Sequence, residues 1–153
     1  MSQQLLVKSN EVRQYACPDE SSDSGTEAEK RIEIHSTVGR VFEGIEALGV
    51  LTMQDAGAEQ DEGISRVTYQ FNQLRLSGSD ASAPKFAACF YCRSDIDRAL
   101  ITNELRLGLW APPSFQSNWI VVASKIVVNQ FQLAGMNVRW DGSKYMRPVV
   151  HLA

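Results

Sequence analysis

Two cysteines, Cys89 and Cys92, have the C-x-x-C spacing found in redox pairs and in half of many zinc sites. The run from Lys85 to Arg93 is apolar and of strand length, and side chains three residues apart on a strand point to opposite faces. The chain has no second C-x-x-C pair and no closely spaced histidine pair that would complete a tetrahedral site. We therefore expect both thiols to pack as small hydrophobic groups, with redox or metal chemistry as the alternative.

General acid or base catalysis would involve the two histidines, His35 and His151, which lie near the two ends of the expected domain. The sequence has no G-x-S-x-G, H-E-x-x-H or G-x-x-x-x-G-K-[ST] motif, and no G-x-G-x-x-G that opens a helix. We expect no catalytic residue, no metal ligand and no cofactor. An enzyme whose site leaves no readable motif, with a thiol as its reactive group, remains an alternative.

A second group of residues near the C-terminus interleaves cations with aromatic rings around an Asp-Gly turn. These candidate binding residues are Arg139, Trp140, Lys144, Tyr145 and Arg147. Such a surface can bind a protein, because Trp, Tyr and Arg are enriched at interface hot spots, or it can stack bases and neutralise phosphates. A purely structural alternative is a cross-strand pair of Trp140 and Tyr145. We expect Trp140 to be buried and the three cations to be exposed.

The elements that would position these residues follow from periodicity. Apolar residues at helical spacing predict a helix over 36–48, and alternation predicts a strand over 64–76 with a bulge near residue 73. A short strand is expected over 85–93, a helix from Ser94, and a strand from Glu104 to the two prolines at 112 and 113. The stretch 119–134 is predicted to be a helix, although its β-branched residues leave two strands as the alternative. Residues 136–149 form a hairpin signal around Asp141-Gly142.

Charge is divided unevenly along the chain. Residues 1–63 carry five Lys and Arg against thirteen Asp and Glu, whereas residues 64–153 carry ten against five. The stretch 17–30 is acidic and serine-rich and lacks branched aliphatic and aromatic residues, so it is expected to have no regular structure. We therefore predict a flexible acidic N-terminal extension over residues 1–30 and a single domain over residues 31–153.

Composition limits the class of protein. With 44% hydrophobic and 22% charged residues, the chain is typical of globular domains. The most apolar stretch, Trp119 to Ala123, is far shorter than a membrane-spanning helix, and the N-terminus has no basic lead-in of a secretory signal. Three cysteines are too few for a disulfide scaffold, so we expect a cytoplasmic protein without a membrane partner.

These elements predict an α+β fold: a mostly antiparallel sheet with about three helices on one face and a C-terminal β-hairpin. The alternative is a β-rich sandwich, which would follow if 119–134 were two strands. The expected function is that of a small non-enzymatic binding or regulatory protein that acts through a protein–protein interface and forms a homo-oligomer. An oligonucleotide-binding protein that uses the same hairpin is the alternative.

Overall fold

The computed structural model describes residues 18–77, 85–113 and 116–152 of the 153-residue chain. The chain divides after Glu33 into two units, which are described separately. Helix α1, Pro18–Ala47, crosses this division. Residues 18–30 are therefore helical, although their composition predicted no regular structure, whereas residues 1–17 lie outside the described residues. The predicted domain division, 1–30 and 31–153, stays a prediction.

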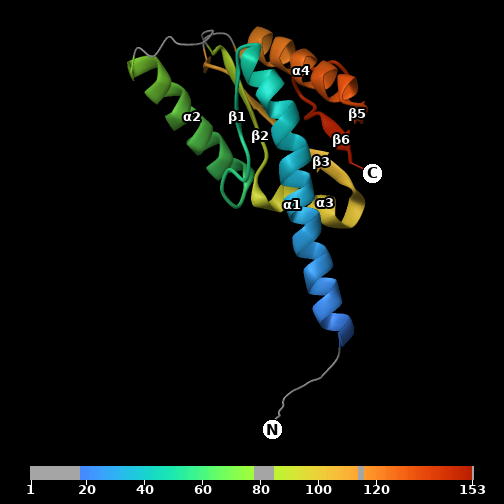
Figure 1. Cartoon of the computed structure of the whole chain (residues 1–153). Coiled ribbons are helices and arrows are strands. Elements are labelled where there is room, and N and C mark those ends of the chain that lie inside the picture. The colour runs from blue at the N-terminus through green and yellow to red at the C-terminus, as the bar shows by residue number, and fades with distance from the viewer. Residues whose placement is uncertain (1–17, 78–84, 114–115, 153) are drawn as a thin grey trace. The chain divides into compact units, whose positions relative to one another are not determined.

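The second unit contains two small sheets (Figure 1). The first has the order β1-β2-β4, with β1 (Val50–Met53) parallel to β2 (Ala87–Phe90) and β4 (Gly108–Trp110) antiparallel to β2. The second is antiparallel and has the order β3-β6-β5, made of Glu104–Arg106, Val149–His151 and Asn137–Arg139. Together with four helices, these sheets confirm the predicted α+β class.

The helices cover both faces of the first sheet, where the sequence suggested one. Alternate strand residues such as Val50 and Cys89 pack against α1 and against α4, Gln116–Leu133. The intervening residues, among them Leu51, pack against α2, Gln60–Ser77. Figure 1 shows α2 beside β1, apart from α4. The remaining helix, α3, spans Arg93–Thr102 between β2 and β3.

The prediction of a strand over 64–76 was wrong, since these residues belong to α2. Val67 and Phe71 fit the alternation but are also four residues apart, and both are buried on one face of the helix. Tyr69, which a strand would have placed on the same face, is 66% exposed. Asp61 and Glu62 lie in the first turn, where the helix dipole favours acidic side chains.

The structure confirms the helices predicted over 36–48 and 119–134. The stripe predicted over 36–48 is buried at Val38, Val41, Phe42 and Ile45, although Leu48 is half exposed. Helix α4 confirms the prediction for 119–134 and excludes the β-rich sandwich. The strand expected from Glu104 is divided at Leu107, so that β3 and β4 belong to different sheets. None of the described helices is long and apolar enough to cross a membrane.

The C-terminal hairpin exists with a different register. β5 pairs with Val149–His151, and Val138 lies opposite Val150, whereas the sequence predicted pairing across Asp141-Gly142. Buried, β-branched Val149 and Val150 form the returning strand, and Pro148 before them has no N–H to donate. The Asp-Gly turn therefore lies inside a longer loop, residues 140–148, called the β5–β6 loop below.

Candidate functional site

The β5–β6 loop is ordered by short-range hydrogen bonds around Ser143. The backbone N–H of Ser143 donates to Oδ1 of Asp141 at 2.9 Å, and Nε1 of Trp140 donates to the carbonyl oxygen of Ser143 at 3.0 Å. The backbone N–H of Tyr145 donates to Oγ of Ser143 at 3.2 Å. Hydrogen bonds from Ser143 also lower the pKa of the Asp141 carboxyl. The loop is thus held in shape by hydrogen bonds between side chains and the backbone, without strand pairing.

This turn presents Tyr145 and Lys144 to solvent. Tyr145 is 85% exposed, and Nζ of Lys144 lies 5.2 Å from the centre of its ring, within cation–π distance. Trp140 is half-buried. The predicted inward position of Trp140 is therefore partly correct, whereas the alternative of a cross-strand pair with Tyr145 is wrong, because both residues lie in the loop.

Arg139 lies on the outward face of the second sheet, where it reaches across β6 to Glu104. Its two terminal nitrogens donate to the two carboxylate oxygens at 3.1 and 3.3 Å. This bidentate pair lowers the pKa of Glu104 and raises that of Arg139. Beside the pair lies a shallow hollow of about 300 Å³ lined by Glu104, Asn137, Val138, Arg139, Val149 and His151.

Arg147 is the predicted binding residue that the structure places elsewhere. Only 21% of its side chain is exposed, and its Nη2 lies 3.0 Å from Oδ2 of Asp95, which is 1% exposed. Its Nε donates to the carbonyl oxygen of Leu107 at 3.1 Å. The expectation that Arg147 is exposed beside Arg139 and Lys144 is therefore wrong, because a buried carboxylate draws the guanidinium inward.

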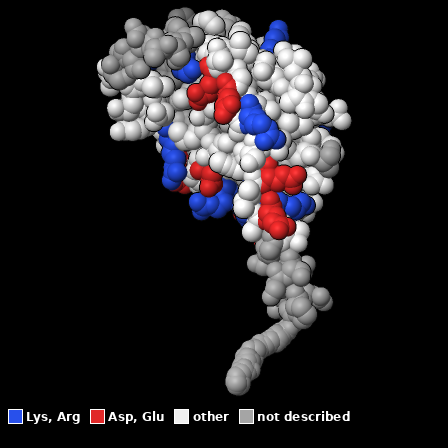
Figure 2. All heavy atoms as spheres, viewed as in Figure 1, with Lys and Arg blue, Asp and Glu red and all other residues white. Residues whose placement is uncertain are grey.

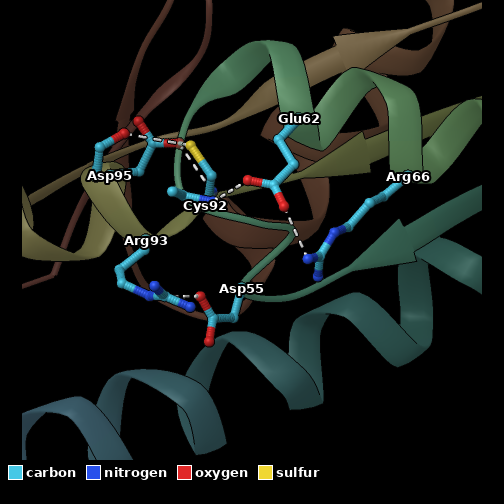
Figure 3. A network of polar contacts seen from close by, with 8 residues as sticks. Asp55, Glu62, Arg66, Cys92, Arg93 and Asp95 are labelled. Carbon is cyan, nitrogen blue, oxygen red and sulfur yellow. Dashed lines mark hydrogen bonds and ion pairs between the residues drawn. The ribbon is translucent and has the colours of Figure 1, made fainter.

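Asp95 is the centre of a polar network at the start of α3 (Figure 3). Besides Arg147, its Oδ2 accepts hydrogen bonds from the backbone N–H of Cys92 at 3.0 Å and from the Cys92 thiol at 3.1 Å. The thiol also lies 3.3 Å from Oγ of Ser94. Asp95 thus links the N-terminus of α3 to the end of the β5–β6 loop.

The N-terminus of α3 is closed by the loop that follows β1. The backbone N–H groups of Arg93 and Ser94 donate to the carbonyl oxygens of Gly57 at 2.9 Å and Ala58 at 3.0 Å. These amides would otherwise form an anion site, but their hydrogen bonds are already made. No phosphate-binding role therefore follows from this helix end.

Two exposed acid–base pairs flank the same loop, as Figure 3 shows. Glu62 accepts from the backbone N–H of Ala58 at 2.9 Å and from Nη2 of Arg66 at 2.8 Å, and both interactions lower its pKa. Arg93 lies 3.8 Å from Asp55, and both side chains are more than half exposed. Solvated pairs of this kind contribute little to stability.

The two cysteines are poor nucleophiles in this setting. Cys89 and Cys92 are free thiols without solvent exposure, and burial raises the pKa of both. The Asp95 carboxylate next to Cys92 opposes formation of a thiolate further. Reactive cysteines need the opposite surroundings, which are accessible and electropositive. This geometry speaks against the thiol-based alternative.

Alkylation tests this reading. In a Cys17→Ser variant, iodoacetamide at mildly alkaline pH should modify Cys89 and Cys92 at least about 100-fold more slowly in the folded protein than in denaturant, since reaction requires opening. The measurement is the mass of the intact protein over time. Rapid modification of either thiol under native conditions would revive the thiol-based enzyme.

The two histidines lie in separate places, and the described residues form no candidate metal site. His151 lines the hollow beside Glu104, and His35 is exposed on α1. Within the described ranges, no three His, Cys, Asp or Glu side chains gather in a way that could hold a metal ion. Cys17 lies outside the described residues.

Sequence reasoning missed Asp95 and Glu104 as partners of the predicted cations. Asp95 lies three residues after the N-cap Cys92, and a carboxylate at this position is a capping signal that a sequence can show. Glu104 gave no signal, because only the pairing of β3, β6 and β5 brings it to Arg139.

The uneven charge of the sequence does not become a divided surface on the face shown in Figure 2. Among the described residues there, acidic and basic side chains alternate in small groups. A protein that tracks a nucleic-acid backbone needs a continuous basic strip, which this face does not offer.

Comparison with known proteins places the chain without describing its activity. No curated protein and no solved structure matches it. One family model, described as a domain of unknown function, DUF6891, matches residues 26–152, and the chain belongs to this family.

Proposed function

We propose that the protein is a non-enzymatic binding or regulatory module that recognises another protein through the β5–β6 loop and the adjoining outward face of the second sheet. The observation that carries this proposal is Tyr145, an aromatic side chain 85% exposed on a loop that hydrogen bonds hold in shape. An exposed tyrosine on an ordered loop loses little conformational freedom on binding, and it brings a large contact area.

The charge arrangement favours a protein over a nucleic acid as the partner. Arg139 is paired with Glu104, and Arg147 is paired with Asp95. Each pairing neutralises a cation that would otherwise contact phosphate, which reduces the sequence-independent attraction on which nucleic-acid binding depends. Among the hairpin residues predicted from the sequence, Trp140, Lys144 and Tyr145 remain, and the two aromatic types are enriched at protein interfaces.

Affinity capture from native cell extract with the full chain tests the proposal. Tyr145→Ala should reduce the recovered partner protein at least about 10-fold, because truncation of a hot-spot residue costs 2 kcal/mol or more. Tyr69→Ala is the matched control, since Tyr69 is also a largely exposed tyrosine, on α2. Its recovery should equal that of the unmodified chain.

Nuclease treatment separates the two partner classes in the same experiment. A protein partner should be recovered equally with and without nuclease. Equal recovery by Tyr145→Ala and the unmodified chain would refute the proposal, and nuclease-sensitive recovery would favour the oligonucleotide-binding alternative.

A further inference from the structure

β5 is an edge strand, and the surface around it is open. Among the residues that the structure describes, the sheet order is β3-β6-β5, and Asn137–Arg139 is paired on one side alone. Leu133, just before it, is 73% exposed, and the residues from 132 to 139 are exposed or half-buried throughout. An edge of this kind offers unpaired N–H and C=O groups to another extended strand.

A cavity lies where β5 begins. Its volume is about 340 Å³, and it is lined by Thr37, Arg40, Val41, Gln130, Leu133, Ala134 and Met136. Met136 immediately precedes β5, so the cavity adjoins the start of the edge strand. Arg40 is exposed at the cavity, and no ion pair with another described residue is found for it.

We propose that β5 pairs antiparallel with β5 of a second copy of this chain, around a two-fold axis at Val138. In that register, Asn137 lies opposite Arg139 of the second copy, and no like charges face each other directly. The two second sheets would then form one six-stranded sheet. This inference rests on the proposed function, since it treats the C-terminal strand pair as a protein interface and names one protein that binds there.

The same register accounts for the cavity. Continued past the strand, it places Met136 opposite Trp140 of the second copy and Gly135 opposite Asp141 of the second copy. The half-buried indole would cover the apolar lining, and the Asp141 carboxylate would approach the unpaired Arg40. The two-fold axis repeats both contacts, so one surface supplies both halves of the interface.

Because the two-fold axis repeats the same contacts, a second copy of the chain fits the edge of β5 better than an unrelated extended peptide does. A peptide would use the edge and the cavity but would leave Asp141 and Trp140 of the β5–β6 loop without a role. Because β5 has only three residues, the added backbone pairing is short, and we expect a dimer no tighter than about 1 μM.

Sedimentation equilibrium of the full chain at concentrations from about 5 to about 500 μM tests the inference. The unmodified chain should be dimeric at the upper end. Leu133→Glu should weaken the dimer at least about 30-fold, because the two-fold interface contains the charge twice. Leu76→Glu is the matched control, since Leu76 is 80% exposed on α2, and it should dimerise normally.

Charge exchange tests the register itself. Arg40→Asp should weaken the dimer, and the double variant Arg40→Asp, Asp141→Arg should restore it in part, because the pair is rebuilt with reversed sign. A chain that stays monomeric at the highest concentration, or a dimer that Leu133→Glu leaves unchanged, would overturn the inference. So would the absence of any restoration by the double variant, provided that it is folded by circular dichroism.

The outcome is separable from that of the proposed function. Tyr145 is not placed in the two-fold contact, so Tyr145→Ala should dimerise like the unmodified chain while it loses its partner protein. A monomeric protein that still needs Tyr145 for capture would refute only the dimer. A dimer whose capture does not depend on Tyr145 would refute only the proposed function.

Discussion

Replacing Asp95 with alanine is expected to lower the free energy of unfolding by about 3–5 kcal/mol, the usual cost of removing one partner of a buried ion pair. The change leaves the largely buried Arg147 guanidinium without a counter-charge and deprives the Cys92 N–H of its acceptor. Denaturation by urea, followed by tryptophan fluorescence and by circular dichroism, measures the loss.

Two further variants show whether the uncompensated charge is the cause. Arg93, also on α3, forms a solvated ion pair with Asp55 at 3.8 Å. Arg93→Ala breaks this pair and should lower the free energy of unfolding by no more than about 0.5 kcal/mol. The double variant Asp95→Ala, Arg147→Met removes both charges and should recover at least about 1 kcal/mol relative to Asp95→Ala. If the free energy of unfolding of Asp95→Ala lies within about 1 kcal/mol of that of the unmodified chain, the ion pair of Asp95 and Arg147 is not important for stability.

Gly108→Ala is expected to destabilise the protein by about 3 kcal/mol, at the upper end of the cost of overpacking. A Cβ atom at this position would lie 2.4 Å from Cζ of Phe90, whose ring is fully buried. Gly63 of α2 contacts the same ring, since a Cβ there would lie 2.5 Å from Cε2. The buried ring therefore lies close to two glycine backbones and has little room to move aside. Thermal unfolding gives the measurement.

The control for this variant is a glycine whose neighbour can move. A Cβ at Gly44 would meet Oε1 of Gln130 at 2.9 Å, the end of a flexible side chain, and alanine favours the helix there. Gly44→Ala should therefore be neutral or stabilising. Phe90→Leu should relieve Gly108→Ala in the double variant, and a lack of such coupling would show that the ring is not the obstacle.

The sequence predicted the parts of the fold that local patterning determines. The buried stripe of α1 from Val38 to Ile45 and the apolar face of α4 have clear helical spacing, and both helices form. α2 was misread because Val67 and Phe71 satisfy both periods. β1 was missed because four residues, Val50–Met53, are too few to show alternation.

The site was less predictable, because its interactions join residues far apart in the chain. Tyr145 and Lys144 could be singled out by composition, and Lys144 is exposed as predicted, whereas the exposure of Tyr145 follows from its place in the β5–β6 loop. Arg147 could not be separated from them, since its partner Asp95 is 52 residues away. Which cation turns inward is decided by tertiary packing, on which the order of residues along one segment gives no information.

The confinement of Phe90 also restricts how this part of the chain can change over evolutionary time. Gly63, Phe90 and Gly108 share one volume, so the residues allowed at any one position depend on the other two. A larger side chain at either glycine position is strongly disfavoured while the aromatic ring remains. A mutational path to alanine at position 108 is therefore easier when residue 90 first becomes smaller, because that change leaves a cavity that the later alanine can fill.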